Sequence, residues 1–146
     1  MKIPVSVLVV IHTAGSEVLL LERADHPGYW QSVTGSLDAM DEPLIKAAAR
    51  ELLEETGIDV DQLPSGALRS MDHSVEYEIY PQWRHRYPPG IVKNTEYWFE
   101  LELPSRMPVT LAPREHTSFR WESISVAASL CFSPSNQEAI LRLKIK

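Results

Sequence analysis

The first third of the chain alternates between apolar stretches and short polar turns. Residues 3–12 are rich in valine and isoleucine, which is typical of a buried strand, and 17–23 form a second apolar stretch after the turn 12–16. We expect these two strands to pair. Residues 29–34 then predict a short extended piece that leads into Gly35.

A helical pattern occupies residues 43–56. Pro43 suits a first turn, Gly57 suits the position after the last turn, and Asp41 or Glu42 can cap the start. At about 100° per residue, the apolar side chains gather on one arc, which we predict to be the buried face. Its members are Leu44, Ile45, Ala48, Ala49, Leu52, Leu53 and Thr56.

The remainder of the chain predicts more strands followed by helices. Strands are expected at 67–80, 93–103 and 118–122, a helical stretch at 123–130, and a final helix capped by Ser135 or Asn136 that runs to about Lys144. A proline-rich segment, 81–90, joins the first two of these strands. The mixed order of elements favours an α/β or α+β sandwich, and 146 residues suit one domain over 1–146.

Composition narrows the classes of partner and compartment. A formal net charge of −6 argues against a nucleic-acid duplex as partner, because such binding depends on basic residues that neutralise phosphates. The longest apolar run, 3–11, is far shorter than the roughly 20 residues of a membrane helix, so we expect no membrane partner. The chain has a single cysteine, Cys131, so it cannot form an internal disulfide. This favours a reducing compartment, and we expect a cytoplasmic location. The sequence leaves the oligomeric state open.

The end of the predicted helix carries an unexpected set of carboxylates. Glu51, Glu54 and Glu55 lie in its last two turns, although a helix C-terminus disfavours negative charge and like charges one turn apart repel. The helical arrangement places Glu55 at the edge of the apolar arc and Glu51 beside it, while Arg50 can hold Glu54. One reading is a solvated acidic face. The other is that Glu51 and Glu55 converge on a hard divalent cation.

The segment 35–58, GSLDAMDEPLIKAAARELLEETGI, resembles the signature of the Nudix hydrolases. That signature is Gly, five residues, Glu, seven residues, then Arg-Glu-apolar-any-Glu-Glu-any-Gly-apolar. Here six residues separate Gly35 from Glu42, while the spacing from Glu42 to Arg50 is intact. We therefore expect the loop path to change and the helix geometry to survive. The resemblance implies a Nudix-type α/β/α sandwich with a mixed sheet and a catalytic loop-helix.

The resemblance also implies a cation, Mg²⁺ or Mn²⁺, and roles for individual residues. Many family members add a carboxylate from a loop before a late strand, and Glu115 in LAPREHTSFRW occupies that place. We expect the adjacent His116 to be structural or exposed and not a ligand of Mg²⁺, which prefers oxygen. The implied metal ligands are Glu51, Glu55, Glu115 and the carbonyl of Gly35. The implied catalytic set is Arg50, Glu51, Glu54 and Glu115, with the general base open among the three carboxylates.

Further fragments resemble one branch of that family. PVSVLVVI, YWQSVTGS, VEYEIY, RHRYPPG, NTEYWF and SNQEAI are similar to the bacterial dihydroneopterin triphosphate pyrophosphatases of folate biosynthesis, also described as dATP pyrophosphohydrolases. This resemblance implies hydrolysis of dihydroneopterin triphosphate to the monophosphate and pyrophosphate. The alternatives are a pyrophosphohydrolase for dATP, an oxidised purine triphosphate or a dinucleoside polyphosphate, a non-catalytic nucleotide-binding module, and an acidic protein-interaction domain.

Substrate contacts can be suggested from side-chain chemistry. Phosphate candidates are Lys2, Arg23, Thr34, Arg84 and Arg86, and ring candidates are Tyr77, Glu78, Ile79 and Tyr80. Ser133, near the cap of the last helix, is a further candidate contact. On a strand, Tyr77 and Ile79 face one way while Glu78 and Tyr80 face the other, so we expect one set to line a ring pocket. Trp30 could stack on a ring or fill the core. Each of these residues has a structural alternative.

Overall fold

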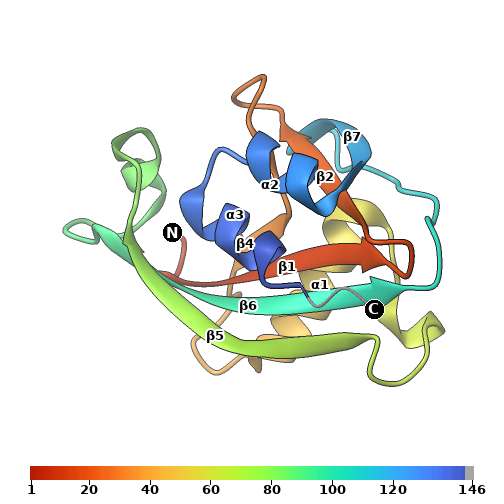
Figure 1. Ribbon diagram of the computed structural model, residues 1–146. Helices are drawn as coiled ribbons and strands as arrows, with labels where there is room; N and C mark the ends of the chain where they lie inside the picture. Colours follow the sequence, from red (N-terminus) through yellow and green to blue (C-terminus); the bar gives the residue numbers. More distant parts are fainter. Residues whose placement is uncertain (144–146) are drawn as a thin grey trace.

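A mixed β-sheet forms the centre of the computed structural model, which describes residues 1–143 (Figure 1). The strands are β1 (Val5–Thr13), β2 (Glu17–Arg23), β3 (Trp30–Gln31), β4 (Val33–Ser36), β5 (Leu68–Glu78), β6 (Lys93–Leu103) and β7 (His116–Ser123). The main path runs β3-β2-β1-β6-β5, with β4 paired to β1 and β7 paired to β2. Strands β1 and β6 run parallel, and the other pairs are antiparallel.

Helices cover both faces of this sheet. Helix α1 (Leu44–Thr56) lies behind it in Figure 1, while α2 (Ile124–Leu130) and α3 (Pro134–Leu141) lie in front. Two short 3₁₀ helices, η1 (Val60–Gln62) and η2 (Pro81–Arg86), complete the elements.

The residues of β1 alternate between the two faces of the sheet. Val7, Val9 and Ile11 join the core cluster on the α1 side, whereas Leu8 and Val10 join the cluster under α2 and α3. The result is the α/β/α sandwich that the sequence predicts. None of the helices within residues 1–143 is both long and apolar enough to cross a membrane.

The strand predictions are confirmed in position, with two differences in pairing. The predicted β1–β2 pair meets only at His12↔Val18, because β1 pairs along its whole length with β6 and over residues 6–9 with β4. The predicted piece 29–34 divides into β3 and β4, which pair with different neighbours.

Both predicted N-terminal caps are wrong. Pro43 precedes α1 and no side chain caps that helix, because Glu42 bonds with Arg50 instead. Ser133 precedes α3, while the side chain of Asn136 bonds with buried Ser32. The predicted end of the last helix near Lys144 lies outside the described residues, and α3 itself ends at Leu141.

The buried face of α1 is rotated toward its acidic edge. Ile45 and Leu53, predicted to be buried, are 49% and 52% exposed, whereas Glu51 and Glu55 are buried. The end of the helix is as predicted, since Gly57 adopts a left-handed conformation and its N–H donates to the carbonyl of Leu53. Apolar periodicity therefore located the helix, but it misplaced the part that faces the sheet.

Candidate active site

One pocket of about 1010 Å³ gathers most of the predicted site residues. Those that line it are Lys2, Arg23, Thr34, Gly35, Arg50, Glu51, Glu54, Glu55, Tyr77, Glu78, Ile79, Tyr80, Arg86, Glu115 and Ser133. They come from the start of the chain, from β2, β4, α1, the end of β5, η2 and the segments before β7 and α3. Arg84 is outside this lining, and its Nε donates to the carbonyl of Ile79 at 2.9 Å.

Buried carboxylates form one side of the pocket. Glu55 is 1% exposed, and within residues 1–143 neither of its carboxylate oxygens accepts a hydrogen bond. One ligand atom each from Glu55, Glu115 and His116 lie within 4.8 Å of one another. Burial raises the pKa of Glu55 well above its usual range, the nearby Glu51 carboxyl adds to that rise, and burial also raises the pKa of Glu51.

These carboxylates fit a divalent cation. A buried carboxylate without a partner is unfavourable, and an oxygen-preferring ion is the partner that would compensate it. Glu51 and Glu55 lie one turn apart on α1, so they present their oxygens in the same direction. The missing counter-charge that the sequence suggests is therefore matched by unpaired acceptors in the structure.

Gly35 allows β4 to approach Glu51 closely. A Cβ atom built at Gly35 would overlap the carboxyl group of Glu51. Only glycine leaves room for that carboxyl group against the strand.

Arg50 holds the acidic side in place. Its Nε and one Nη bind both oxygens of Glu42 at 3.0 Å, and its other Nη donates to Glu51 at 2.8 Å. The N–H of Asp38 also donates to Glu42 at 2.8 Å, so the loop with the additional residue folds back and α1 keeps its geometry. These partners raise the pKa of Arg50 and lower that of Glu42. Arg50 thus orients Glu51.

Glu54 and Glu115 are the more accessible carboxylates. The side chain of Glu54 is 53% exposed and lies 3.6 Å from Arg50, as the spacing of four residues predicts. Glu115 is exposed and is fixed through its backbone carbonyl, which accepts from the N–H of Ala24 at 2.9 Å.

His116 is buried in a fixed orientation and is not exposed. Arg23 donates to the side-chain oxygen of Gln31 at 3.1 Å, which leaves the Gln31 amide nitrogen to donate to Nε2 of His116 at 3.2 Å. Burial, with Arg23 nearby, lowers the pKa of His116 to about 4. The imidazole is therefore neutral near pH 7.

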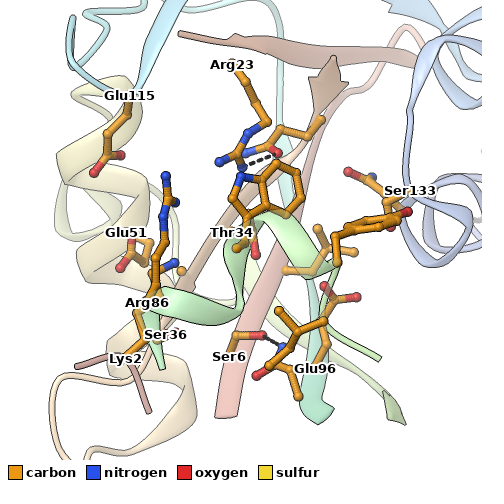
Figure 2. A pocket seen from close by; sticks show the side chains of 18 of the residues that line it. Lys2, Ser6, Arg23, Thr34, Ser36, Glu51, Arg86, Glu96, Glu115 and Ser133 are labelled. Atoms are coloured by element: carbon orange, nitrogen blue, oxygen red, sulfur yellow. Dashed lines mark hydrogen bonds between the residues drawn. The ribbon is translucent and has the colours of Figure 1, made fainter. Parts of the chain in front are cut away.

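Cationic side chains line the same pocket as the carboxylates. Asp25 accepts from Arg23 at 2.7 and 2.8 Å and from Arg86 at 3.1 Å, so one carboxylate orients both guanidinium groups. Burial, together with Arg86 and Arg23, lowers the pKa of Lys2. Lys2 and Arg86 lie on the same side of the view as Glu51 in Figure 2. Positive and negative groups thus face one pocket, as metal-assisted phosphate binding requires.

Aromatic side chains line another part of the pocket. Tyr80, Trp83 and Phe132 form a cluster with ring centroids 5.4 to 6.0 Å apart, and Arg23 lies over Trp83 at 4.3 Å. Sequence reasoning missed Trp83 and Phe132, although Trp83 lies in the proline-rich segment and Phe132 directly precedes Ser133.

The predicted alternation of residues 77–80 ends with the strand. All four residues line the pocket, because β5 stops at Glu78 and the chain turns into η2. The expectation that only one alternating set faces the pocket is therefore wrong. Thr34 also lines it, although its hydroxyl donates to the carbonyl of Val7 at 3.0 Å. Trp30 is outside the lining and packs against the core under α2 and α3.

Comparisons with known proteins agree with this geometry. Residues 2–143 match the NUDIX domain family. The chain is 44% identical over 142 residues to the dihydroneopterin triphosphate diphosphatase of Escherichia coli K12, covering 95% of this chain and 91% of that protein. It is 42% identical over 136 residues to the protein of the same name from Haemophilus influenzae, covering 92% and 84%.

A solved structure is similar over almost the whole chain. The E. coli dihydroneopterin triphosphate pyrophosphohydrolase superposes with a TM-score of 0.89 and 43% identity, covering 97% of this chain and 95% of that one. Together with the family match, this likeness shows that the chain belongs to the NUDIX family of hydrolases.

Proposed function

We propose that the protein hydrolyses dihydroneopterin triphosphate to dihydroneopterin monophosphate and pyrophosphate with a divalent cation, Mg²⁺ or Mn²⁺. The observation that carries this proposal is the buried, unpaired carboxylate of Glu55 beside Glu51, facing cations in the same pocket. The names of the similar enzymes from E. coli and H. influenzae support the choice of substrate.

The cation would be held by Glu51, Glu55, Glu115 and the carbonyl of Gly35. When bound, it supplies charge neutralisation for the phosphates and a water of lowered pKa. Arg50 keeps Glu51 in position through its bonds to Glu42 and Glu51. Gly35 keeps the space that the carboxyl group of Glu51 occupies.

The chain's own residues bind the triphosphate and accept a proton. Lys2, Arg23 and Arg86 donate to phosphate oxygens, with Asp25 fixing the directions of the two guanidinium groups. The attacking water forms a bond to phosphorus, the anhydride bond between the α- and β-phosphates breaks, and pyrophosphate leaves with the electron pair. The water proton passes to a carboxylate oxygen.

The proton acceptor is one of Glu51, Glu54 and Glu115. Replacement of each by glutamine, with kcat followed against pH, identifies it as the carboxylate whose loss removes the acidic limb of the profile.

The ring of the substrate lies against the aromatic part of the pocket. Tyr77, Ile79 and Tyr80 supply apolar surface there, and Glu78 and Ser133 supply polar edges. The one-domain organisation, the cytoplasmic location and the exclusion of a nucleic-acid duplex as partner stay predictions.

Steady-state kinetics test the proposal. Pyrophosphate release is measured with Mg²⁺ from dihydroneopterin triphosphate and from dATP, for the wild type and Glu55→Gln. We expect kcat/KM to be much higher for the pterin and to collapse in the variant. Equal or higher kcat/KM for dATP would overturn the substrate and keep the hydrolase chemistry.

A further inference from the structure

The buried side chain of Gln31 connects a phosphate-binding candidate to the acidic side of the pocket. Gln31 is 4% exposed, lines the pocket and is the last residue of β3. Its Oε1 accepts from Nη1 of Arg23 at 3.1 Å, and its Nε2 lies 3.2 Å from Nε2 of His116. In Figure 2, Glu51 and Glu115 lie on the same side of Arg23.

The directions of the hydrogen bonds at Gln31 are determined by Arg23. A guanidinium group can only donate, so the amide oxygen of Gln31 faces Arg23 and the amide nitrogen faces His116. Two further bonds from Arg23 to Asp25, at 2.7 and 2.8 Å, hold the guanidinium group in place. The amide N–H of Gln31 therefore donates to Nε2 of His116, and the imidazole carries its proton on Nδ1.

His116 lies beside the carboxylates that are proposed to hold the cation. Its Nε2 is 3.8 Å from Oε1 of Glu55, which is too long for a hydrogen bond. Bonds from Zn²⁺ to nitrogen or oxygen are roughly 2.0–2.2 Å long, so two such ligand atoms of one ion lie at most about 4.3 Å apart. The separation of 3.8 Å is within that limit. His116 is thus close enough to Glu55 for both to bind one ion.

The lone pair of Nε2 decides whether His116 can be a metal ligand. A neutral imidazole has one acceptor nitrogen, and here that nitrogen accepts the N–H of Gln31. The other ring nitrogen, Nδ1, is buried and has no hydrogen-bond partner among the described residues. With Gln31 in place, the ligands that remain for a cation are the carboxylate oxygens and the carbonyl of Gly35.

We propose that Gln31 determines the metal preference of the site by keeping the imidazole nitrogen of His116 away from the cation. This inference rests on the cation site of the proposed function. Oxygen ligands alone suit Mg²⁺ and Mn²⁺, whereas an additional imidazole nitrogen favours later transition metals such as Co²⁺ and Zn²⁺. Gln31 acts here through His116, as a positioning residue.

Gln31→Met tests the assignment because methionine fills a similar space without an amide N–H. The lone pair of His116 then loses its donor and becomes available to a cation. Changes in the groups that hydrogen-bond with metal-ligating side chains alter metal affinity by about 10- to 100-fold. We expect the ratio of the Kd for Mn²⁺ to the Kd for Co²⁺ to rise by about that factor. Electron paramagnetic resonance of free Mn²⁺, with Co²⁺ as competitor and no substrate, measures both constants.

Two spectroscopic measurements report on the imidazole itself. In the metal-free wild type, the ¹⁵N chemical shifts of His116 should place the ring proton on Nδ1. The electron spin echo of bound Mn²⁺ is modulated by a coordinated ¹⁴N nucleus, so the wild type should lack this modulation and Gln31→Met should gain it. A merely structural role of Gln31 would not produce that signal.

Two further variants serve as controls. Gln62→Met makes the same substitution at an exposed position of η1 outside the pocket, and it should leave the Kd ratio and the spin echo unchanged. His116→Phe, added to Gln31→Met, removes the nitrogen and should return the ratio and the spin echo to those of the wild type. Thermal unfolding checks that each variant is folded.

The outcomes separate this inference from the proposed function. A folded wild type that binds neither Mg²⁺ nor Mn²⁺ overturns the cation site and the proposed function with it. A wild type that binds Mn²⁺ but carries the His116 proton on Nε2, or already shows a coordinated nitrogen, overturns the role of Gln31 alone. An unchanged Kd ratio in folded Gln31→Met does the same. A raised ratio with a new nitrogen signal, both lost on addition of His116→Phe, supports it.

Discussion

The two ends of the pocket differ in how their charges are compensated. At the α1 end, Glu55 is buried without a hydrogen bond and Glu51 lies beside it, so like charges are held together by the fold. At the β6 end, Glu96 is also buried, but Trp98 and Ser135 bind one of its oxygens. The first arrangement suits an ion of high charge, and the second suits a neutral ring edge.

The comparison teaches that the residues proposed for phosphate hydrolysis and those that surround the substrate ring come from different parts of the chain. The α1 end is built mainly from one continuous segment, 35–58, whose contacts are local. The β6 end needs three distant segments, the strand itself, η2 and the start of α3. A change at the first end should affect every triphosphate alike, whereas a change at the second should depend on the ring.

The largest effect is expected for Glu55→Gln. The loss of a metal ligand should lower kcat by about a thousandfold or more on dihydroneopterin triphosphate and dATP alike, because metal-assisted catalysis stabilises charge in the transition state. The same variant should raise the Tm of the metal-free protein, since one of two neighbouring buried carboxylates becomes neutral. Glu138→Gln, at an exposed position of α3, serves as the control and should change neither quantity. A ring-dependent loss would contradict the division between the two ends.

Gly35→Ala is expected to have the second-largest effect. It should lower kcat/KM about a hundredfold for all triphosphates. The added methyl group would overlap the carboxyl group of Glu51, and such overpacking costs about 1–3 kcal/mol of stability besides displacing the ligand. Kinetics against Mg²⁺ concentration and thermal unfolding measure both effects. Gly15→Ala is the matched control, because the nearest atom to its new Cβ is 3.7 Å away. Wild-type activity in Gly35→Ala would remove the argument for close packing.

Asp25→Ala should raise KM about tenfold for every triphosphate, with a smaller effect on kcat. Its loss frees the guanidinium groups of Arg23 and Arg86, which must then be ordered by the substrate at a cost of about 0.5–1.5 kcal/mol each. Initial rates on dihydroneopterin triphosphate and dATP measure the change. A KM that rises for only one of the two substrates is the contrary result.

Phe132→Ala should weaken binding of the ring by about tenfold, within the roughly 1–3 kcal/mol that aromatic stacking contributes. Competitive inhibition by dihydroneopterin monophosphate should weaken, while inhibition by inorganic tripolyphosphate, which has no ring, should stay unchanged. Phe119→Ala, at an exposed position of β7, is the control. Equal weakening of both inhibitors would place Phe132 at the phosphate end instead.

The smallest expected effect is on the pH dependence of the free energy of unfolding, through the carboxyl group of Asp25. Its hydrogen bonds with Arg23 lower the pKa of this carboxyl from 3.8 to about 2. A lowered pKa in the folded state gives stability that is present above about pH 4 and is lost as the pH falls toward 2. The difference in free energy of unfolding between the wild type and Asp25→Asn should therefore shrink over that range. A constant difference would show that the ion pairs do not stabilise the fold.

The sequence predicts the α1 end well because its residues have fixed spacing. The Glu42-to-Arg50 interval and the Glu51, Glu55 pair define a geometry within one loop and one helix, and Gly57 marks the end. The exposure of Ile45 and Leu53 could not be predicted, since it depends on how α1 is rotated against the sheet.

The β6 end was largely hidden in the sequence. Glu96 lies in an apolar strand where alternation alone gives no reason to expect a ligand contact, and its partner Ser135 is 39 residues away. Trp83 and Phe132 meet only after η2 and the start of α3 are placed. Arg84 is outside the pocket lining because its Nε donates to the carbonyl of Ile79, and its role as a phosphate contact stays a prediction.

The most direct test of the central claim is the ratio of kcat/KM for dihydroneopterin triphosphate over dATP, measured with Mg²⁺ in the wild type, Glu55→Gln and Asp25→Ala. The account predicts a ratio well above one in the wild type, and it predicts that both variants lower kcat/KM for both substrates and keep the ratio, with the larger loss in Glu55→Gln. A wild-type ratio below one, or a ratio that shifts in either variant, would contradict the account.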